Sequence, residues 1–292
     1  MCAAFFLLIR SAPLSAMNTP PPAPRSRPLH TVDTPCAPTP HVGEPLLLVD
    51  NSNTRTKFAL LRHGESCPSR VRSCATADIS ADTLRRTLAG WAYARAVVCS
   101  VAPAAAELLR AHLGCAVESL SAAHCPHLLR GYAAPHTLGA DRIANAAAVA
   151  ACYPLPCVAV DLGTACTFDL VVAEPEGPRF LGGAIAPGLH TAAAALAEKT
   201  AKLPLLSPAE LRTEPTPGAC AQGTQQALLA GLCFGFCGMV RGVLAEMSRP
   251  LAQPPCVVLT GGDADLLADQ LEGDVYVDNL LTIKGIISLS RG

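Results

Sequence analysis

The stretch Val160-Asp161-Leu162-Gly163-Thr164-Ala165-Cys166-Thr167 decides the fold, because it repeats the pattern of an earlier stretch, Leu48-Val49-Asp50-Asn51-Ser52-Asn53-Thr54. In each copy an apolar strand ends in an aspartate, a tight turn of small polar residues follows, and a return strand begins. The two copies stand about 110 residues apart, and each opens a region in which strands and helices alternate. The repeat therefore predicts two similar α/β halves.

A turn of this kind has two interpretations. Asp, Asn, Gly and Ser are ordinary turn residues, so a single copy would favour a simple hairpin. The same turn also offers backbone N–H groups and hydroxyls to phosphate oxygens, and its aspartate can hold a cation or the waters of a cation. Because the pattern occurs twice, we favour two turns that face each other and clasp a nucleoside triphosphate. Neither a G-x-x-x-x-G-K-S/T loop nor a G-x-G-x-x-G turn occurs in the chain.

The composition excludes several classes of protein. Lys and Arg (22) balance Asp and Glu (23), so the charge does not indicate a surface for nucleic acid. The 14 cysteines show no framework spacing along 292 residues, which favours reduced thiols over a disulfide scaffold. Gly, Pro or charged residues interrupt the apolar runs before the roughly 18 residues that a spanning helix needs, so we expect no membrane span.

The chain divides into three regions. Residues 1–45 are rich in proline and lack a periodic apolar pattern, which predicts a disordered leader. Residues 46–152 are expected to form the first half and residues 153–292 the second. Each half should begin with three strands, of which the third strand of the second half is expected at 179–181.

The segment Gly139-Ala140-Asp141-Arg142 adds an acid between the two turns. It stands at the start of a predicted helix, where Asp141 lies near backbone N–H groups and beside a cation. An isolated aspartate there would be interpreted as a helix cap. Its place between two phosphate turns favours a residue that orients a substrate hydroxyl in phosphoryl transfer.

Together these motifs resemble type III pantothenate kinases, a family of the acetate and sugar kinase, heat-shock chaperone and actin superfamily. The resemblance covers the chain from about Leu46 to the C-terminus. It implies an α/β fold of duplicated actin-like (ribonuclease H-like) halves with a nucleotide cleft between them. The segments that match the family in order and spacing are 50–57, 139–145, 161–169, 182–188 and 260–263.

The resemblance implies a cytoplasmic, homodimeric enzyme that uses ATP and Mg²⁺ to convert pantothenate to 4′-phosphopantothenate, the first step toward coenzyme A. Asp141 would be the catalytic carboxylate, and Asp161 would hold a monovalent cation, K⁺ or NH₄⁺. The residues implied to bind ATP are Asp50, Asn51, Ser52, Asn53, Thr54, Arg55, Thr56, Lys57 and Thr164. The residues implied to bind pantothenate are Tyr132, Gly139, Ala140, Asp141, Arg142 and Thr224, and the apolar segment 228–240 suits either a subunit interface or a buried core.

The first turn departs from the family pattern, because Ser52 stands where the family has glycine. A serine there would strain the turn if the position needed a positive φ, or its hydroxyl could donate to a phosphate oxygen. Two other functions stay open at this point. One is a non-catalytic relative that acts as a regulatory accessory protein, and the other is a kinase for another small hydroxylated acid or sugar.

Overall fold

The computed structural model describes residues 30–31, 44–68, 70–212 and 218–290. The predicted disordered leader therefore lies almost entirely outside the described residues. Two of its residues form β1 (His30–Thr31), which pairs in parallel with an edge strand of the second sheet.

Strands and helices alternate in both halves as the repeat predicts. The first half contains β2 (Leu46–Asn51), β3 (Arg55–Leu61), β4 (Arg70–Ala75), η2 (Thr76–Asp78), α1 (Ala81–Thr87), β5 (Arg95–Ser100), α2 (Pro103–His112), β6 (Ala116–Ser119), η3 (Ala122–His124), η4 (Pro135–Thr137) and α3 (Ala140–Cys152). The second half contains β7 (Cys157–Leu162), β8 (Ala165–Glu174), β9 (Gly177–Pro187), α4 (Leu189–Lys199), α5 (Pro208–Leu211), α6 (Thr224–Ser248), β10 (Cys256–Thr260), α7 (Ala264–Ala268), β11 (Val275–Val277) and α8 (Leu281–Leu289).

The two sheets have the same topology, which confirms the predicted duplication. The first sheet has the order β4-β3-β2-β5-β6, and the second has the order β9-β8-β7-β10-β11, with β1 at its end. In each, the first three strands are antiparallel and the next two add in parallel. Asp50 pairs with Cys99 on β5 and Asp161 pairs with Thr260 on β10, so both aspartates occupy corresponding places.

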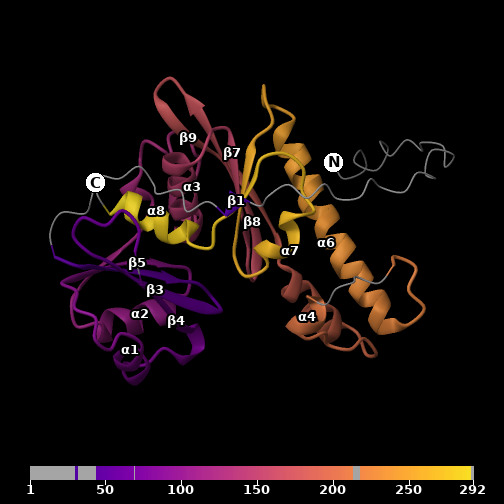
Figure 1. Ribbon diagram of the computed structural model, residues 1–292, viewed down its shortest axis with the longest axis horizontal. Helices are drawn as coiled ribbons and strands as arrows, with labels where there is room; N and C mark the ends of the chain where they lie inside the picture. Colours follow the sequence, from indigo (N-terminus) through magenta and orange to yellow (C-terminus); the bar gives the residue numbers. More distant parts are fainter. Residues whose placement is uncertain (1–29, 32–43, 69, 213–217, 291–292) are drawn as a thin grey trace.

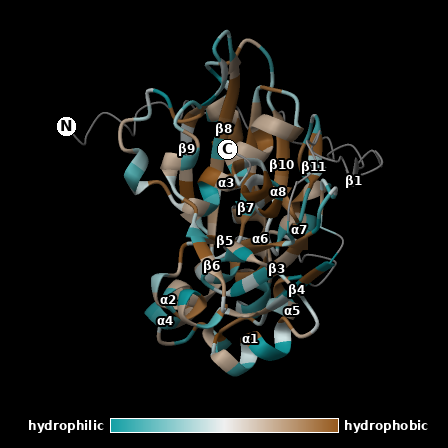
Figure 2. Ribbon diagram, turned by 90° about the vertical axis from the view of Figure 1, so that its left-hand side faces the viewer, coloured by the Kyte–Doolittle hydropathy of each residue, from teal (hydrophilic) through white to brown (hydrophobic). Residues whose placement is uncertain are grey.

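Three apolar clusters hold the layers together. One lies on the outer face of the first sheet against α1 and α2, and another lies on the outer face of the second sheet against α4, α6 and α7. The third fills the space between the sheets, where α3 and α8 lie side by side (Figure 1). The hydropathy colouring shows the same division, with apolar strands such as β8 and β10 inside (Figure 2).

The helices α3 and α8 approach each other closely because their facing residues are small. Alanine occupies most of the middle of α3, and Gly285 faces it from α8. A Cβ atom on Gly285 would lie 1.8 Å from the carbonyl oxygen of Ala144, so no larger residue fits at this crossing. This contact sets the distance between the two halves.

Several elements differ from the sequence-based expectation, among them β1 in the predicted leader and the short helices η2, η3 and η4. The strand β6 and the short helix α5 were not predicted, and β9 extends over Gly177–Pro187 rather than over 179–181. The β6 strand is largely exposed, so it lacks the alternating apolar pattern that identifies a half-buried strand. The β9 strand contains two adjacent glycines, which weaken any strand pattern in a sequence.

We expect Gly285→Ala to lower the free energy of unfolding by about 1–3 kcal/mol, because the added methyl group meets the backbone of α3. Thermal and denaturant unfolding would measure the change. Gly218→Ala is the matched control, since a Cβ atom there meets nothing within 4 Å. Equal stability of the two variants would show that the halves are not held by this crossing.

Candidate functional site

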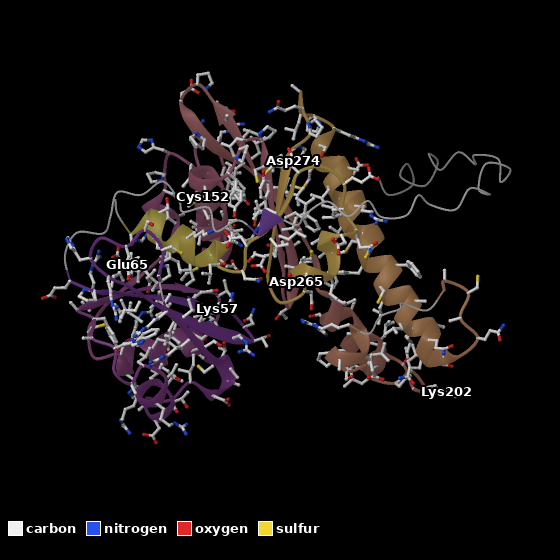
Figure 3. The ribbon with its side chains drawn as sticks, viewed as in Figure 1. Lys57, Glu65, Cys152, Lys202, Asp265 and Asp274 are labelled. Atoms are coloured by element: carbon white, nitrogen blue, oxygen red, sulfur yellow. The ribbon has the colours of Figure 1, made fainter. Side chains whose placement is uncertain are left out.

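The first turn joins β2 to β3 and carries a buried aspartate at its start. Asp50 is 4% exposed, and its carboxylate accepts a hydrogen bond of 3.1 Å from the Ser52 hydroxyl. The Lys57 ammonium lies 3.8 Å from the same carboxylate and donates to the carbonyl oxygen of Asn279. In Figure 3 the Lys57 side chain lies on the side of the first half that faces Asp265 of the second half. The turn thus presents a carboxylate and an ammonium toward the other half.

Not all of the residues predicted for the first turn face the other half. Asn51 and Thr56 are buried and bond to each other over 2.7 Å, so they hold the shape of the turn. The Arg55 guanidinium donates to Ser73 on β4. The residues left around the open side of the turn are Asp50, Ser52, Asn53, Thr54 and Lys57.

Ser52 is not strained. Among the described residues, only glycines adopt a positive φ, so position 52 does not need a left-handed backbone and the condition for strain is not met. The Ser52 hydroxyl donates to Asp50, and its carbonyl oxygen accepts a bond of 2.6 Å from Thr76. Serine therefore stabilises the turn and its aspartate.

The second turn meets the first one directly. The Thr164 hydroxyl lies 2.9 Å from the Thr54 hydroxyl, and each threonine is the last residue before the return strand of its turn. The sequence repeat therefore corresponds to two facing turns in space, as predicted. The backbone of the second turn is fixed by Gly188 and Thr191, which both donate to the carbonyl oxygen of Thr164.

Glycines allow neighbouring segments to approach the second turn. A Cβ atom on Gly188 would lie 2.0 Å from the carbonyl oxygen of Gly163. Gly261 has a φ of +92°, and a Cβ atom there would lie 2.7 Å from Oδ1 of Asp161. The glycines of the motifs 182–188 and 260–263 thus leave an open space beside the Asp161 carboxylate.

Asp141 lies at the N-terminal end of α3, for which Gly139 is the N-cap. Its Oδ1 atom accepts a bond of 2.7 Å from the backbone N–H of Arg142. Burial raises its pKa, and the backbone bond and the charge of Arg142 oppose that rise. The Arg142 side chain turns toward β8, where its Nε donates to Asp169 over 2.8 Å.

The carboxylates of Asp50, Asp141 and Asp161 lie close enough to interact. Burial, together with the charges of Asp141 and Asp50, raises the pKa of Asp161 to about 6. Burial also raises the pKa of Asp50, with a smaller contribution from Asp141. These shifts place the three carboxylates in one region of unfavourable negative charge. The buried thiol of Cys99 lies beside them, and its pKa rises through burial and through all three charges.

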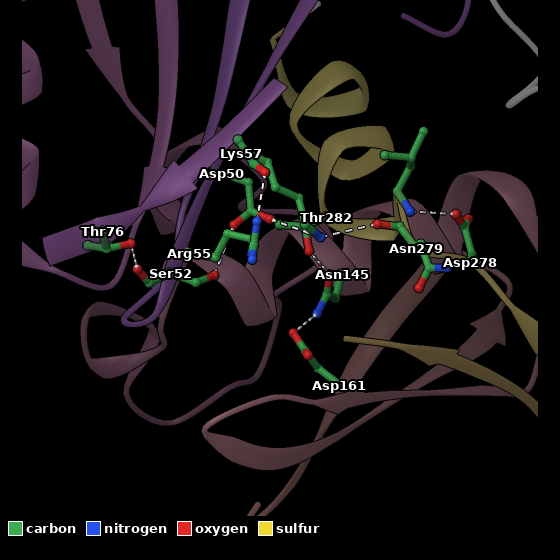
Figure 4. A network of polar contacts seen from close by, with 12 residues as sticks. Asp50, Ser52, Arg55, Lys57, Thr76, Asn145, Asp161, Asp278, Asn279 and Thr282 are labelled. Carbon is green, nitrogen blue, oxygen red and sulfur yellow. Dashed lines mark hydrogen bonds and ion pairs between the residues drawn. The ribbon is translucent and has the colours of Figure 1, made fainter. Parts of the chain in front are cut away.

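A chain of polar contacts links both aspartates of the turns to the start of α8 (Figure 4). Thr282 donates to Oδ1 of Asn145 over 2.9 Å, and Nδ2 of Asn145 donates to Asp161 over 3.3 Å. On the other side, Lys57 joins Asp50 to Asn279. The central helices thus orient the charged groups of both turns.

The structure brings Tyr132 to the expected region but not Thr224. The Tyr132 ring lies 5.3 Å from that of Phe180, over which the Arg142 guanidinium lies at 5.9 Å. Thr224 is exposed at the first residue of α6. The helix α6 packs on the outer face of the second sheet, whereas α3, which carries Asp141, packs between the two sheets (Figure 1).

A cavity of about 890 Å³ adjoins the start of α3. Gly139 and Ala140 line it together with Ser100 and Val101 at the end of β5. Its remaining lining comes from the loop region between β6 and α3, and is largely apolar. A small molecule in this cavity would lie next to the helix end that carries Asp141.

The carboxylates of Asp50 and Asp161 suit cations that are bound partly by the protein and partly by a ligand. No group of three or more His, Cys, Asp or Glu side chains among the described residues could hold a metal ion by itself. A single carboxylate such as Asp50 beside a phosphate turn suits Mg²⁺, which is commonly bound by one or two carboxylates and by substrate phosphates. At Asp161, Oδ2 is occupied by Asn145, while Oδ1 faces the space that Gly163 and Gly261 leave open. That space and charge suit a monovalent cation.

Sequence patterns did not indicate the roles of Asn145, Asp169 and Thr282. Asn145 and Asp169 lie within motifs that matched the family, but no role could be given to them without their partners. Their contacts join α3 to α8 and α3 to β8, and therefore depend on tertiary packing.

Comparison with known proteins identifies close relatives. The family model for type III pantothenate kinase matches residues 46–246. The type III pantothenate kinase of Akkermansia muciniphila is 40% identical over 242 residues, which are 82% of this chain and 96% of the relative. That of Methylacidiphilum infernorum is 36% identical over 243 residues, which are 82% of this chain and 86% of the relative.

Solved structures support the fold. A conserved putative Baf family transcriptional activator from Campylobacter jejuni has a TM-score of 0.53 at 20% identity, over 84% of this chain and 97% of that one. The ethanolamine utilization protein EutJ from Carboxydothermus hydrogenoformans has a TM-score of 0.54 at 14% identity, over 86% and 91%. At these identities the likeness concerns the arrangement of the two halves only.

Proposed function

The chain belongs to the type III pantothenate kinase family, and from this premise we propose how its residues carry out the reaction. The duplicated actin-like halves form a kinase that phosphorylates pantothenate in coenzyme A biosynthesis. The observation that carries the residue assignment is the contact of the two turns at Thr54 and Thr164, beside the carboxylates of Asp50, Asp141 and Asp161. We assign residues 46–152 and 153–292 as the two halves of this kinase.

The two turns are proposed to hold the phosphates of ATP between them. Backbone N–H groups and the hydroxyls of Thr54 and Thr164 would donate to phosphate oxygens, and Lys57 would neutralise their charge. Asp50 would hold Mg²⁺ or its waters, and the cation would neutralise charge on the phosphates when bound. Separation of the two threonines on ATP binding would open the space for the phosphates.

Asp141 is proposed to accept or orient the proton of the primary hydroxyl of pantothenate. Its raised pKa makes the carboxylate a better proton acceptor than an exposed aspartate. Gly139 and Arg142 would hold the substrate beside it, with the adjoining cavity and Tyr132 forming further walls. The hydroxyl would then attack the γ-phosphate in line.

A coupled assay with ATP, Mg²⁺ and pantothenate tests this function, with Asp141→Asn as the decisive variant. We expect wild-type turnover and a loss of 10² to 10⁴ in kcat for Asp141→Asn, roughly the range of a general base. The variant should keep its melting temperature within a few degrees. Inactive wild-type protein would favour the non-catalytic accessory role, and a variant within threefold of wild type would exclude Asp141 from the chemistry.

Asp161 is proposed to hold K⁺ or NH₄⁺. A buried carboxylate that lies near two others is destabilised by repulsion unless a cation balances it. Its pKa rises above the usual value near 4, so the ionised form destabilises the fold. That destabilisation grows as the pH rises from about 4 to about 6, and is complete above this range.

We expect Asp161→Asn to unfold at a higher temperature than wild type at pH 8 without K⁺, by about 1–2 kcal/mol in free energy. The difference should vanish below about pH 4, where the Asp161 carboxyl is protonated in both the folded and the unfolded wild-type chain. Added K⁺ should stabilise wild type and leave Asp161→Asn unchanged, since ligand binding shifts stability only where a site exists. Differential scanning calorimetry would measure both effects, and equal responses of the two proteins to K⁺ would exclude the site.

The helix α6 is proposed to form the interface of a homodimer. It is the one described helix that is long and apolar enough to span a membrane, contrary to the sequence-based expectation. Only 22% of its apolar 18-residue stretch is buried. Phe234 is 51% exposed, and a Cβ atom on Gly231, Gly235 or Gly238 would meet nothing within 4 Å. An exposed apolar face lined with glycines allows a second helix to approach closely. In such a dimer, Thr224 could serve the partner's site.

We expect Gly235→Leu to convert a wild-type dimer to monomer, because the new side chain would separate the two helices. Sedimentation velocity would measure the change, with Ala104→Leu on the exposed face of α2 as the matched control. The monomeric variant should also show a raised KM for pantothenate, if Thr224 acts across the interface. A monomeric wild type, or an unchanged dimer of Gly235→Leu, would contradict the proposal.

The proposed location is the cytoplasm, where ATP and Mg²⁺ are available. No two cysteines in the part of the chain that the structure describes form a disulfide, which fits a reducing compartment.

A further inference from the structure

The ion pair between Arg142 and Asp169 is buried between α3 and the second sheet. The Asp169 side chain is fully buried and the Arg142 side chain is 11% exposed. Nε of Arg142 donates to Oδ1 of Asp169 over 2.8 Å, and Nη2 lies 2.7 Å from the same oxygen. Within the described residues, however, Nη2 of Arg142 and Oδ2 of Asp169 have no hydrogen-bond partner of suitable geometry.

Small residues of the second sheet leave room for this guanidinium. Asp169 on β8 pairs with Ala159 on β7 and with Gly183 on β9, so both strand neighbours are small. A Cβ atom on Gly183 would lie 2.7 Å from Nη2 of Arg142 and 1.7 Å from the carbonyl oxygen of Phe168. Asp169 and the backbone of Gly183, which has no side chain, therefore hold the guanidinium in this position.

Stability alone does not account for this arrangement. A buried ion pair seldom stabilises a fold more than apolar residues of similar volume would, and unpaired buried atoms are unfavourable. Arg142 also lies in the first turn of α3, where the helix dipole disfavours a positive charge. A cation held there, next to Asp141 in the chain, is instead suited to bind an anion.

We propose that Asp169 is a positioning residue that aims the Arg142 guanidinium at the carboxylate of pantothenate. The inference rests on the proposed function, in which the hydroxyl at the other end of pantothenate meets Asp141. Asp169 would fix the edge of the guanidinium that Nε and Nη2 form, so that the N–H donors of Nη1 are left for the substrate carboxylate. A planar guanidinium held at one edge loses little further freedom when a carboxylate binds, which favours both affinity and selectivity.

The test compares two substrates, pantothenate and its alcohol analogue, in which CH₂OH replaces the carboxylate. For each, kcat/KM is measured for wild type, Asp169→Ala, Asp169→Asn and the control Glu174→Ala, which removes a β8 carboxylate paired with Arg130. If the alcohol is not phosphorylated, its inhibition constant against pantothenate replaces kcat/KM. If Asp169→Ala does not fold, Asp169→Ser replaces it, because the serine hydroxyl is too short to reach Nε.

We expect Asp169→Ala to raise the KM for pantothenate by about 10- to 100-fold, the range of a lost charge-assisted interaction, with the KM for ATP within twofold of wild type. The preference for pantothenate over the alcohol should fall by the same factor. Asp169→Asn retains an oxygen for the Nε–H group and should restore the preference to within about fivefold, and Glu174→Ala should leave it unchanged.

A merely structural role gives a different result. In that case Asp169→Ala would lower the melting temperature and the apparent kcat, while the preference between the two substrates stayed at the wild-type value, and this would overturn the inference. Wild-type protein without activity on pantothenate would instead overturn the proposed function on which the inference rests.

Discussion

The crossing of α3 and α8 between the two sheets is the contact on which the site depends. Gly285 allows the backbone of α8 to reach Ala144, and the alanines of α3 fill the remaining space with little side-chain volume. From this crossing, α3 extends toward the turns and carries Asp141 and Asn145, while α8 contributes Thr282. A larger residue at the crossing would move the two sheets apart, and with them the facing turns.

Electrostatic repulsion is the second constraint. The charges of Asp50 and Asp141 raise the pKa of Asp161, and the charge of Asp141 raises that of Asp50, so the residues of the site bring together more negative charge than their surroundings balance. The cations of the chain that lie near these groups, Lys57 and Arg142, are both held by other contacts as well. Such an arrangement is unfavourable by itself and becomes favourable with bound cations, which a nucleotide–metal complex provides. The charge pattern and the proposed phosphoryl transfer are therefore consistent.

The glycines of this fold fall into two groups, which allow close contacts within the chain or leave a helix face open. At Gly183, Gly188 and Gly261, a Cβ atom would meet backbone or charged atoms of the second turn, or of the segment that supports it. On α6, in contrast, the glycines face open space in the single chain. The first group permits contacts within the chain, and the second group leaves room for contacts that the single chain does not make.

The sequence alone determined the duplication, the two turns and the acid between them in the chain, because local patterns encode these features. An apolar strand that ends in Asp50 or Asp161 and a helix that begins after Gly139 depend on neighbouring residues only. The sequence alone did not reveal β6, the full length of β9 or the unstrained conformation of Ser52. The tertiary structure decided which side chains serve the site: Asn51 and Thr56 are buried and bond to each other, Asn145 reaches Asp161, and Asp169 holds Arg142. These contacts join residues from different elements. The close crossing of α3 and α8 and the glycines of β9 bring the partners together, and a local sequence pattern does not record which distant residues will meet.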